Sequence, residues 1–351
     1  MVKDLILISK YAGMREDLAQ AGGGNSSVKL DEERMLIKAS GVQLADVTET
    51  EGFSVVDYPM ITDFMEKLVV GENTVSANEI LEKALIEGKR PSIETFLHAI
   101  TGKVTLHTHS LPVNILTASN EGMDRLRSLF PEALFVEYAT PGAHLAQKYF
   151  EAYLKKSNGT KVVYPVIFLQ NHGLIVSGDT AGEVIQMTDE VNEAVEKEIA
   201  VDCSAYRKAF EIFQTFEKSS LTKGKVIVKA ENEKLLQCFR KFGYKVWDYQ
   251  FCPDCVVFGG MKPYDFQVSS KACDIDAFAC KYGEPVIVTY GEDLYIRADS
   301  VRKAREIESV LAFSGQVALT TTRLQGLNLL SEKEQKFLLN WDAEKYRNQM
   351  K

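Results

Sequence analysis

The sequence has few cysteines and no long apolar run. Six cysteines in 351 residues are too few for a disulfide scaffold, which favours the reducing cytoplasm as the compartment. No apolar run reaches the roughly 18–20 residues that a membrane helix needs. The first ten residues have too short an apolar stretch for a signal peptide, and no small-residue cleavage site follows. We therefore expect a cytoplasmic protein without a membrane segment.

Positive charge is also in short supply. The chain carries 41 Lys and Arg against 49 Asp and Glu, a formal net charge of −8. Nucleic acids and anionic membranes attract basic surfaces, so we expect neither of them as a partner. An anionic small substrate stays open, because a local pocket can oppose the global charge. Apolar residues make up 45% and charged residues 26% of the chain, which is ordinary for a globular protein.

A polar segment without aromatic residues divides the chain at residues 218–224. It is typical of a linker, and the length of the chain favours two domains. We predict one domain over 1–217 and a smaller α/β domain over 224–351.

The second part has no histidine, Gly-rich nucleotide loop or nucleophile motif, so its role stays open. Its predicted strands cover 245–249, 255–258, 285–289 and 294–296, and its predicted helices cover 231–242, 300–319 and 331–349.

One cysteine pair in this second part has the spacing of a redox motif or of a metal knuckle. The pair is Cys252-Pro-Asp-Cys255, and Cys-x-x-Cys occurs in both kinds of site. No second pair accompanies it, since Cys273 and Cys280 are too widely spaced. We favour the interpretation that these cysteines are free structural thiols.

Two of the five histidines lie in one predicted strand, Val104-Thr-Leu-His107-Thr-His109. Positions i and i+2 of a strand point to the same side of the sheet, so both imidazoles can approach one ion. His172 follows another apolar run, and three histidines with an open fourth position are typical of catalytic zinc. The sequence therefore predicts a Zn²⁺ site. We interpret His98 and His144 as structural.

Short polar segments upstream offer groups that could bind phosphate. Gly22-Gly-Gly24-Asn25 and Ser40-Gly41 supply backbone N–H groups, and Ser92 opens a predicted helix. The same residue types are also typical of turns and helix caps. Glu94 falls in the first turn of that helix, which leads into the histidine strand, and this makes it a candidate general base.

Together these motifs resemble one family. Gly23-Gly-Asn25-Ser-Ser, Ala39-Ser40-Gly41, Pro91-Ser92-x-Glu94, His107-x-His109 and Asn171-His172-Gly occur in the order seen in the class II aldolase/adducin family. The resemblance covers residues 3–215. A weaker resemblance, around 251–258 and 341–346, links the remainder to rhamnulose-phosphate aldolase/dehydrogenase fusion proteins.

The resemblance implies an α/β/α sandwich around a mainly antiparallel sheet, usually a homotetramer or other homo-oligomer. It implies that zinc is bound by His107, His109 and His172, and that Glu94 is the acid/base carboxylate. It implies phosphate-binding groups at Asn25, Ser40, Gly41 and Ser92. We add Lys38 to this group, because it stands beside Ser40 and could supply positive charge.

The activity implied is that of a zinc-dependent aldolase, which cleaves or forms a phosphorylated ketose through a metal-bound enediolate. A sugar-phosphate dehydratase is an alternative that keeps the glutamate. A 4-epimerase is another, although the family's epimerases carry Asp at the position of Glu94. A non-catalytic, adducin-like interaction module is the remaining alternative. The family's aldolases use a second acid/base residue, a tyrosine, but none stands between Ser110 and Ala133, so that role is unassigned.

Overall fold

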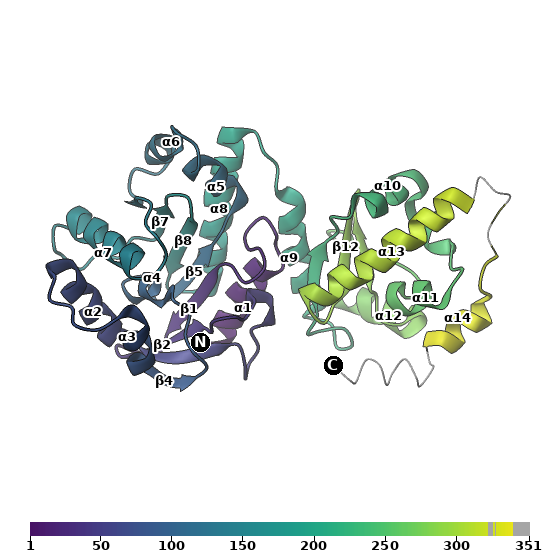
Figure 1. Cartoon of the computed structure of the whole chain (residues 1–351). Helices are drawn as coiled ribbons and strands as arrows, with labels where there is room; N and C mark the ends of the chain where they lie inside the picture. Colours follow the sequence, from purple (N-terminus) through teal and green to yellow (C-terminus); the bar gives the residue numbers. More distant parts are fainter. Residues whose placement is uncertain (322–325, 327, 340–351) are drawn as a thin grey trace. The chain divides into compact units, whose positions relative to one another are not determined.

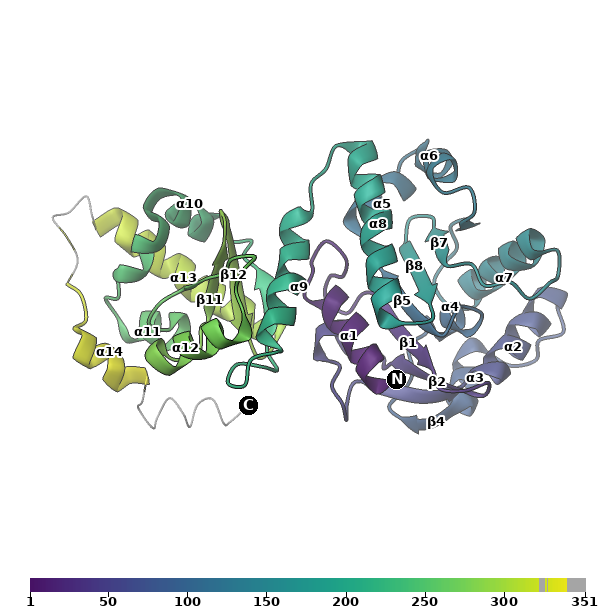
Figure 2. The same ribbon diagram turned by 180° about the vertical axis from the view of Figure 1, so that it is seen from behind.

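The computed structural model of the chain describes residues 1–321, 326 and 328–339. The chain divides into two compact units, Met1–Cys203 and Ser204–Lys351 (Figures 1 and 2). This division precedes the linker predicted at 218–224. Two helices adjoin the division, α8 (Ala181–Ile199) and α9 (Ser204–Phe216), and Ala200 adopts a left-handed conformation that ends the first.

An eight-stranded sheet forms the centre of the first unit. The strands are β1 (Asn25–Lys29), β2 (Arg34–Lys38), β3 (Phe53–Asp57), β4 (Leu85–Gly88), β5 (Val104–Thr108), β6 (Leu134–Val136), β7 (Val166–Leu169) and β8 (Gly173–Gly178). Their order across the sheet is β4-β3-β2-β1-β5-β8-β7-β6. Neighbouring strands are antiparallel except β6 and β7, which confirms the predicted, mainly antiparallel sheet.

Helices cover both faces of this sheet. On one face α1 (Val2–Gly13) and α8 pack against β1, β5 and β8, and they are joined by η1 (Leu44–Asp46), α5 (Leu111–Thr117) and α6 (Gly122–Leu129). The other layer comprises α2 (Tyr58–Val70), α3 (Ala77–Ala84), α4 (Thr95–Ala99) and α7 (Ala143–Ser157) (Figure 1). The predicted α/β/α sandwich is confirmed. Helix α3 ends at Ala84, and β4 follows it directly.

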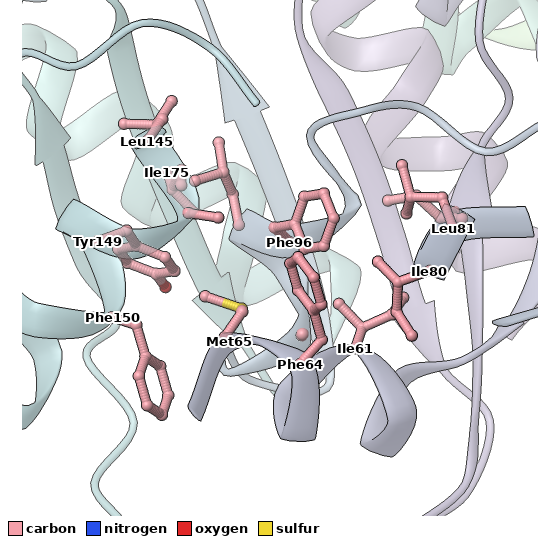
Figure 3. Packing of buried hydrophobic residues seen from close by; sticks show 14 of the residues in the cluster. Ile61, Phe64, Met65, Ile80, Leu81, Phe96, Leu145, Tyr149, Phe150 and Ile175 are labelled. Carbon is pink, nitrogen blue, oxygen red and sulfur yellow. The ribbon is translucent and has the colours of Figure 1, made fainter. Parts of the chain in front are cut away.

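The second helical layer holds α4 in place, and α4 begins next to Glu94. Figure 3 shows side chains of α2, α3, α4 and α7 packed together beside Ile175 of β8. The rings of Phe64 and Phe96 lie 5.4 Å apart, centre to centre. Ile175 is paired with His107 across the β5–β8 ladder, and paired residues of antiparallel strands share a face. His107 therefore points towards the layer that carries α4.

The second unit contains a smaller, four-stranded sheet with the order β10-β11-β12-β9. Its strands are β9 (Val226–Lys229), β10 (Tyr264–Asp265), β11 (Ile287–Tyr290) and β12 (Asp293–Ala298). The helices are α9, α10 (Glu233–Phe242), η2 (Gly243–Asp248), α11 (Pro253–Gly259), α12 (Ala272–Tyr282), α13 (Val301–Thr321) and α14 (Glu332–Leu339). The predicted additional α/β domain is confirmed in its fold class. No helix in the described part of the chain has the length and hydropathy needed to cross a membrane.

Two predicted strands of the second unit are wrong. Residues 245–249 lie mainly in the 3₁₀ helix η2, and residues 255–258 lie in α11. Short apolar runs fit a buried strand and a buried helix equally well, and Pro253 favours a helix start. Strand β9 and helix α12 were not predicted. The predicted helix 331–349 corresponds to α14 up to Leu339, and its remainder, with the motif at 341–346, lies outside the described residues.

Replacing Phe96 by Ala should destabilise the first unit by about 3–5 kcal/mol, because it opens a cavity in the layer that anchors α4. Urea unfolding of the full chain measures this change. Val70→Ala provides the control, since Val70 is 66% exposed at the end of α2 and should change the free energy of unfolding by no more than about 0.5 kcal/mol. A similarly small effect of Phe96→Ala would contradict this role of the ring.

Candidate metal centre

Three histidines reach one point from two neighbouring strand ends. His107 is the fourth residue of β5 and His109 follows its end, while His172 lies in the turn between β7 and β8. In that turn Asn171 has φ of 54°, a left-handed conformation that asparagine tolerates. A Cβ on Gly173 would lie 2.1 Å from the carbonyl oxygen of Thr108. The tight Asn-His-Gly turn thus brings His172 against the end of β5.

The structure brings His107, His109, His172 and Glu94 together. One potential ligand atom from each of the four residues lies within 4.8 Å of all the others. The Glu94 Oε1 atom is 3.5 Å from Nε2 of His107, 3.4 Å from Nε2 of His172 and 4.0 Å from Nε2 of His109. Ring centres of the three histidines are 4.9–5.2 Å apart.

The hydrogen bonds of this cluster fit a cation between the side chains. His107 Nδ1 lies 3.1 Å from the carbonyl oxygen of Leu174 and therefore donates its proton there, which leaves Nε2 with a lone pair. Within the described part of the chain, Nε2 of His107 and of His109 are buried without a hydrogen-bond partner. Buried lone pairs facing a carboxylate require a compensating positive charge. Three imidazoles and a carboxylate can bind a divalent metal, and the metal ion would supply this positive charge.

The ionisation of the cluster suits metal binding. Burial, together with the positive charge that His107 would carry, lowers the pKa of His109 to about 4, so His109 is neutral at pH 7, as a metal ligand must be. Burial alone raises the pKa of Glu94, but the neighbouring imidazoles of His107 and then His172 lower it more, and the net direction is downward. Glu94 is thus a carboxylate that can accept a proton.

The helix start and strand β1 hold Glu94 from two sides. Glu94 is the residue before α4, and its backbone N–H donates to the Ser92 hydroxyl at 3.3 Å. The Asn25 amide donates to Oε2 of Glu94 at 3.4 Å. Asn25 is paired with His107 across the β1–β5 ladder, so Glu94 and the strand that carries His107 share one framework. Asn25, predicted to bind phosphate, therefore contacts the carboxylate.

The glycines before β1 support His109. A Cβ on Gly23 would lie 2.6 Å from Nδ1 of His109, and a Cβ on Gly24 would lie 2.9 Å from the His107 carbonyl oxygen. Gly24 also has φ of +76°, which favours glycine. The sequence suggested close approach of this backbone to a ligand. The structure instead shows close approach to a histidine, a contact that spacing in the sequence could not reveal.

The remaining residues predicted to bind phosphate come from two adjoining loops. Ala39 forms a β-bridge with Pro91, and the Ser40 N–H donates to the Arg90 carbonyl at 2.9 Å. This contact brings the Ser40-Gly41 turn beside Ser92. Gly41 has φ of +76° and no atom near its Cβ position, and Ser40 is exposed.

Lys38 is buried beneath this turn. Its ammonium donates to the carbonyl of Val42 at 2.8 Å, and burial lowers its pKa while the charge of Glu94 raises it. The Lys38 ammonium thus contacts the backbone that follows the turn and interacts with the Glu94 charge, and its role in phosphate binding stays a prediction.

The other histidines lie outside the cluster. His98 is fully buried, and its Nδ1 lies 2.7 Å from the hydroxyl of Ser27. His144 stands at the start of α7, away from the four clustered residues. Tyr138, the first tyrosine after His109, is 58% exposed. No tyrosine is therefore assigned as the second proton carrier.

Replacing Gly23 by Ala should push His109 aside and lower the affinity for divalent metal by about 10–100-fold, the range seen when a partner that orients a ligand is lost. Protein purified without chelator should hold about one ion per chain, and titration with a chromophoric chelator gives the affinity. Gly22→Ala is the matched control, since a Cβ there has nothing within 4 Å. Far less than one ion in the wild type would exclude the metal centre.

His98 should make the metal-free protein sensitive to acid. Burial lowers its pKa from 6.5 to about 3, so between those values only the unfolded chain binds a proton at this site. The free energy of unfolding should be maximal above about pH 6.5 and fall by at most about 1.4 kcal/mol per pH unit on acidification. His98→Asn keeps an acceptor for Ser27 without a titrating group, so its urea-unfolding profile should be flatter. Equal slopes would contradict this assignment.

Comparison with known proteins agrees with this architecture. The family model described as Class II Aldolase and Adducin N-terminal domain matches residues 3–199. A class II aldolase domain of a conserved protein from Thermoplasma acidophilum is 24% identical, with a TM-score of 0.48, and the match covers 56% of this chain and 93% of that one. L-fuculose-1-phosphate aldolase from Thermus thermophilus is 19% identical, with a TM-score of 0.38, and the match covers 57% of this chain and 96% of that one. A comparison with curated proteins found no match. Since the family model spans more than half of the sequence, the chain belongs to the class II aldolase and adducin family.

Proposed function

We propose that this protein is a zinc-dependent aldolase that cleaves or forms a phosphorylated ketose. The observation that carries the proposal is the convergence of three imidazole Nε2 atoms on the Glu94 carboxylate. Three histidines suit a catalytic zinc with an open position for substrate. Membership of the class II aldolase family supports an aldolase-type reaction on a sugar phosphate.

Zinc held by His107, His109 and His172 would act as a Lewis acid on the ketose carbonyl and its neighbouring hydroxyl. The chain itself supplies the proton transfer. The Glu94 carboxylate removes a proton from the carbon beside the carbonyl during condensation and returns it during cleavage. Asn25 donates to Oε2 of Glu94, and this contact leaves Oε1 directed at the three imidazoles and the open position.

The phosphate group would be bound by the two adjoining loops. The hydroxyls of Ser40 and Ser92 and the backbone at Gly41 offer donors, and Lys38 offers a buried positive charge. Asn25 completes the set next to the carboxylate. Binding energy from the phosphate would fix the orientation of the reacting carbons, and such positioning contributes several kcal/mol to catalysis.

Other reactions can use the same residues. A dehydratase also needs the glutamate and the metal, and an epimerase needs the metal to polarise the carbonyl. The glutamate at position 94 favours the aldolase and the dehydratase over the epimerase. We further propose a homotetramer or other homo-oligomer, following the family. A non-catalytic interaction module has no use for buried imidazoles that converge on a carboxylate.

The test is to incubate the zinc-loaded protein with a panel of ketose phosphates and to trap any aldehyde released. An aldolase should form dihydroxyacetone phosphate and an aldehyde. Glu94→Gln should keep its zinc but lose about 10²–10⁴-fold in turnover and in proton exchange at dihydroxyacetone phosphate. Glu87→Gln is the control, because Glu87 is exposed on β4.

The outcomes separate the candidate functions. Loss of water from the substrate without aldehyde indicates the dehydratase, and an isomeric product indicates the epimerase. Proton exchange that persists in Glu94→Gln would remove Glu94 from its catalytic role. No turnover of any sugar phosphate by the zinc-loaded wild type would overturn the proposal.

A further inference from the structure

Cys252 and Cys255 lie side by side across the first turn of α11 in the second unit. Cys252 precedes the helix and Pro253 is its first residue. Cys255 lies three residues after Cys252. Side chains at i and i+3 of a helical turn face each other. The two sulfur atoms are 3.2 Å apart, and the four residues form a Cys-Pro-Asp-Cys sequence with redox-motif spacing.

A small cavity borders Cys255. Its volume is about 20 Å³, and its lining includes Cys255, Ser314, Trp247 and Gln250. Within the described residues, Nε1 of Trp247 and Oε1 of Gln250 are buried without a hydrogen-bond partner. A cavity of this size with two unsatisfied polar atoms can hold a water molecule. The sulfurs, 3.2 Å apart, must approach by about 1.2 Å to reach the 2.03–2.05 Å of a disulfide.

The metal-knuckle interpretation lacks ligands. Among the described residues, the group of Glu94 and the three histidines is the one cluster of three or more His, Cys, Asp or Glu side chains with converging ligand atoms. Two thiols alone are half of a structural zinc site. The sequence has no histidine after His172, so imidazoles from the second unit cannot complete it.

We propose that Cys252 and Cys255 are a redox-active pair, which a small disulfide such as oxidised glutathione converts reversibly into a disulfide. The Cys252 thiolate attacks one glutathione sulfur, forms a mixed disulfide and releases one glutathione thiolate. Cys255 loses its proton and attacks the Cys252 sulfur, which releases the second glutathione. Two protein thiols are oxidised and one glutathione disulfide is reduced to two thiols.

The surroundings assign different roles to the two cysteines. Cys252 is partly exposed and Cys255 is buried, so an external disulfide reaches Cys252 first. The Cys255 sulfur lies 3.0 Å from the hydroxyl of Ser314, which can take part in the transfer of its proton. Burial and the neighbouring Cys255 raise the pKa of Cys252, whereas backbone N–H groups of the turn lower it and the net direction is upward. Exchange should therefore accelerate with pH, about tenfold per unit below that pKa.

The test is to incubate the native full chain at pH 8 with glutathione buffers of increasing oxidised fraction, quench with acid, alkylate, and map the peptides. We expect two of the six thiols to disappear together, a linked peptide 252–255 with a mass about 2 Da lower, and full reversal by excess reduced glutathione. Free Cys252 and Cys255 at every buffer composition would overturn the proposal.

Variants separate the pair from the other thiols. Cys255→Ser should accumulate one glutathione on Cys252, because no partner resolves the mixed disulfide. Cys252→Ser should take up none at Cys255, which is buried. The double variant Cys273→Ser/Cys280→Ser removes the exposed cysteines of α12 and should form the disulfide as the wild type does. Circular dichroism confirms that each variant is folded. Equal thiol loss in the wild type and in Cys252→Ser/Cys255→Ser would contradict the proposal.

Discussion

The register of β5 between β1 and β8 determines the geometry of the metal centre. It sets His107 opposite Asn25 on one side and Ile175 on the other. Asn25 contacts Glu94, and Ile175 belongs to the apolar layer that holds α4. A slip of one residue would turn His107 to the opposite face, because side chains alternate along a strand. The geometry of the candidate metal centre and the packing of the core therefore depend on the same pairing.

Some of the site could be predicted because its geometry is local. His107 and His109 are two residues apart on a strand, and that spacing alone puts their side chains on one side. The fold class and the family followed from five motifs in a fixed order. Which strand ends meet depends on contacts between distant residues, however. From the sequence, the place of His172 beside the other two histidines followed only from the family resemblance, and the β5–β8 ladder is what brings it to β5.

Two kinds of feature were not predicted from the sequence, a tertiary contact and the type of a secondary-structure element. Gly23 touches His109 through tertiary packing, and a glycine run gives no sign of which group will approach it. In the second unit, Cys255–Phe258 is too short an apolar run to indicate helix or strand. There the first residues of the segment, Cys252 and Pro253, decide the outcome by starting a helix. The sequence thus predicted helices and strands well where apolar residues recurred at regular spacing or a helix cap was present.

The tight turn between β7 and β8 has a consequence for the order of assembly. Residues 166–178 form a hairpin whose contacts are close in sequence, and such contacts form early in folding. The pairing of His107 with Ile175 joins residues far apart in the chain, so it carries a larger loop-closure entropy, and we expect it to form later. We therefore expect His172 to be positioned before His107 and His109 join it, and the three imidazoles to come together only once the β5–β8 ladder closes. A chain in which that ladder has not closed offers a metal ion isolated imidazoles instead of a preorganised set.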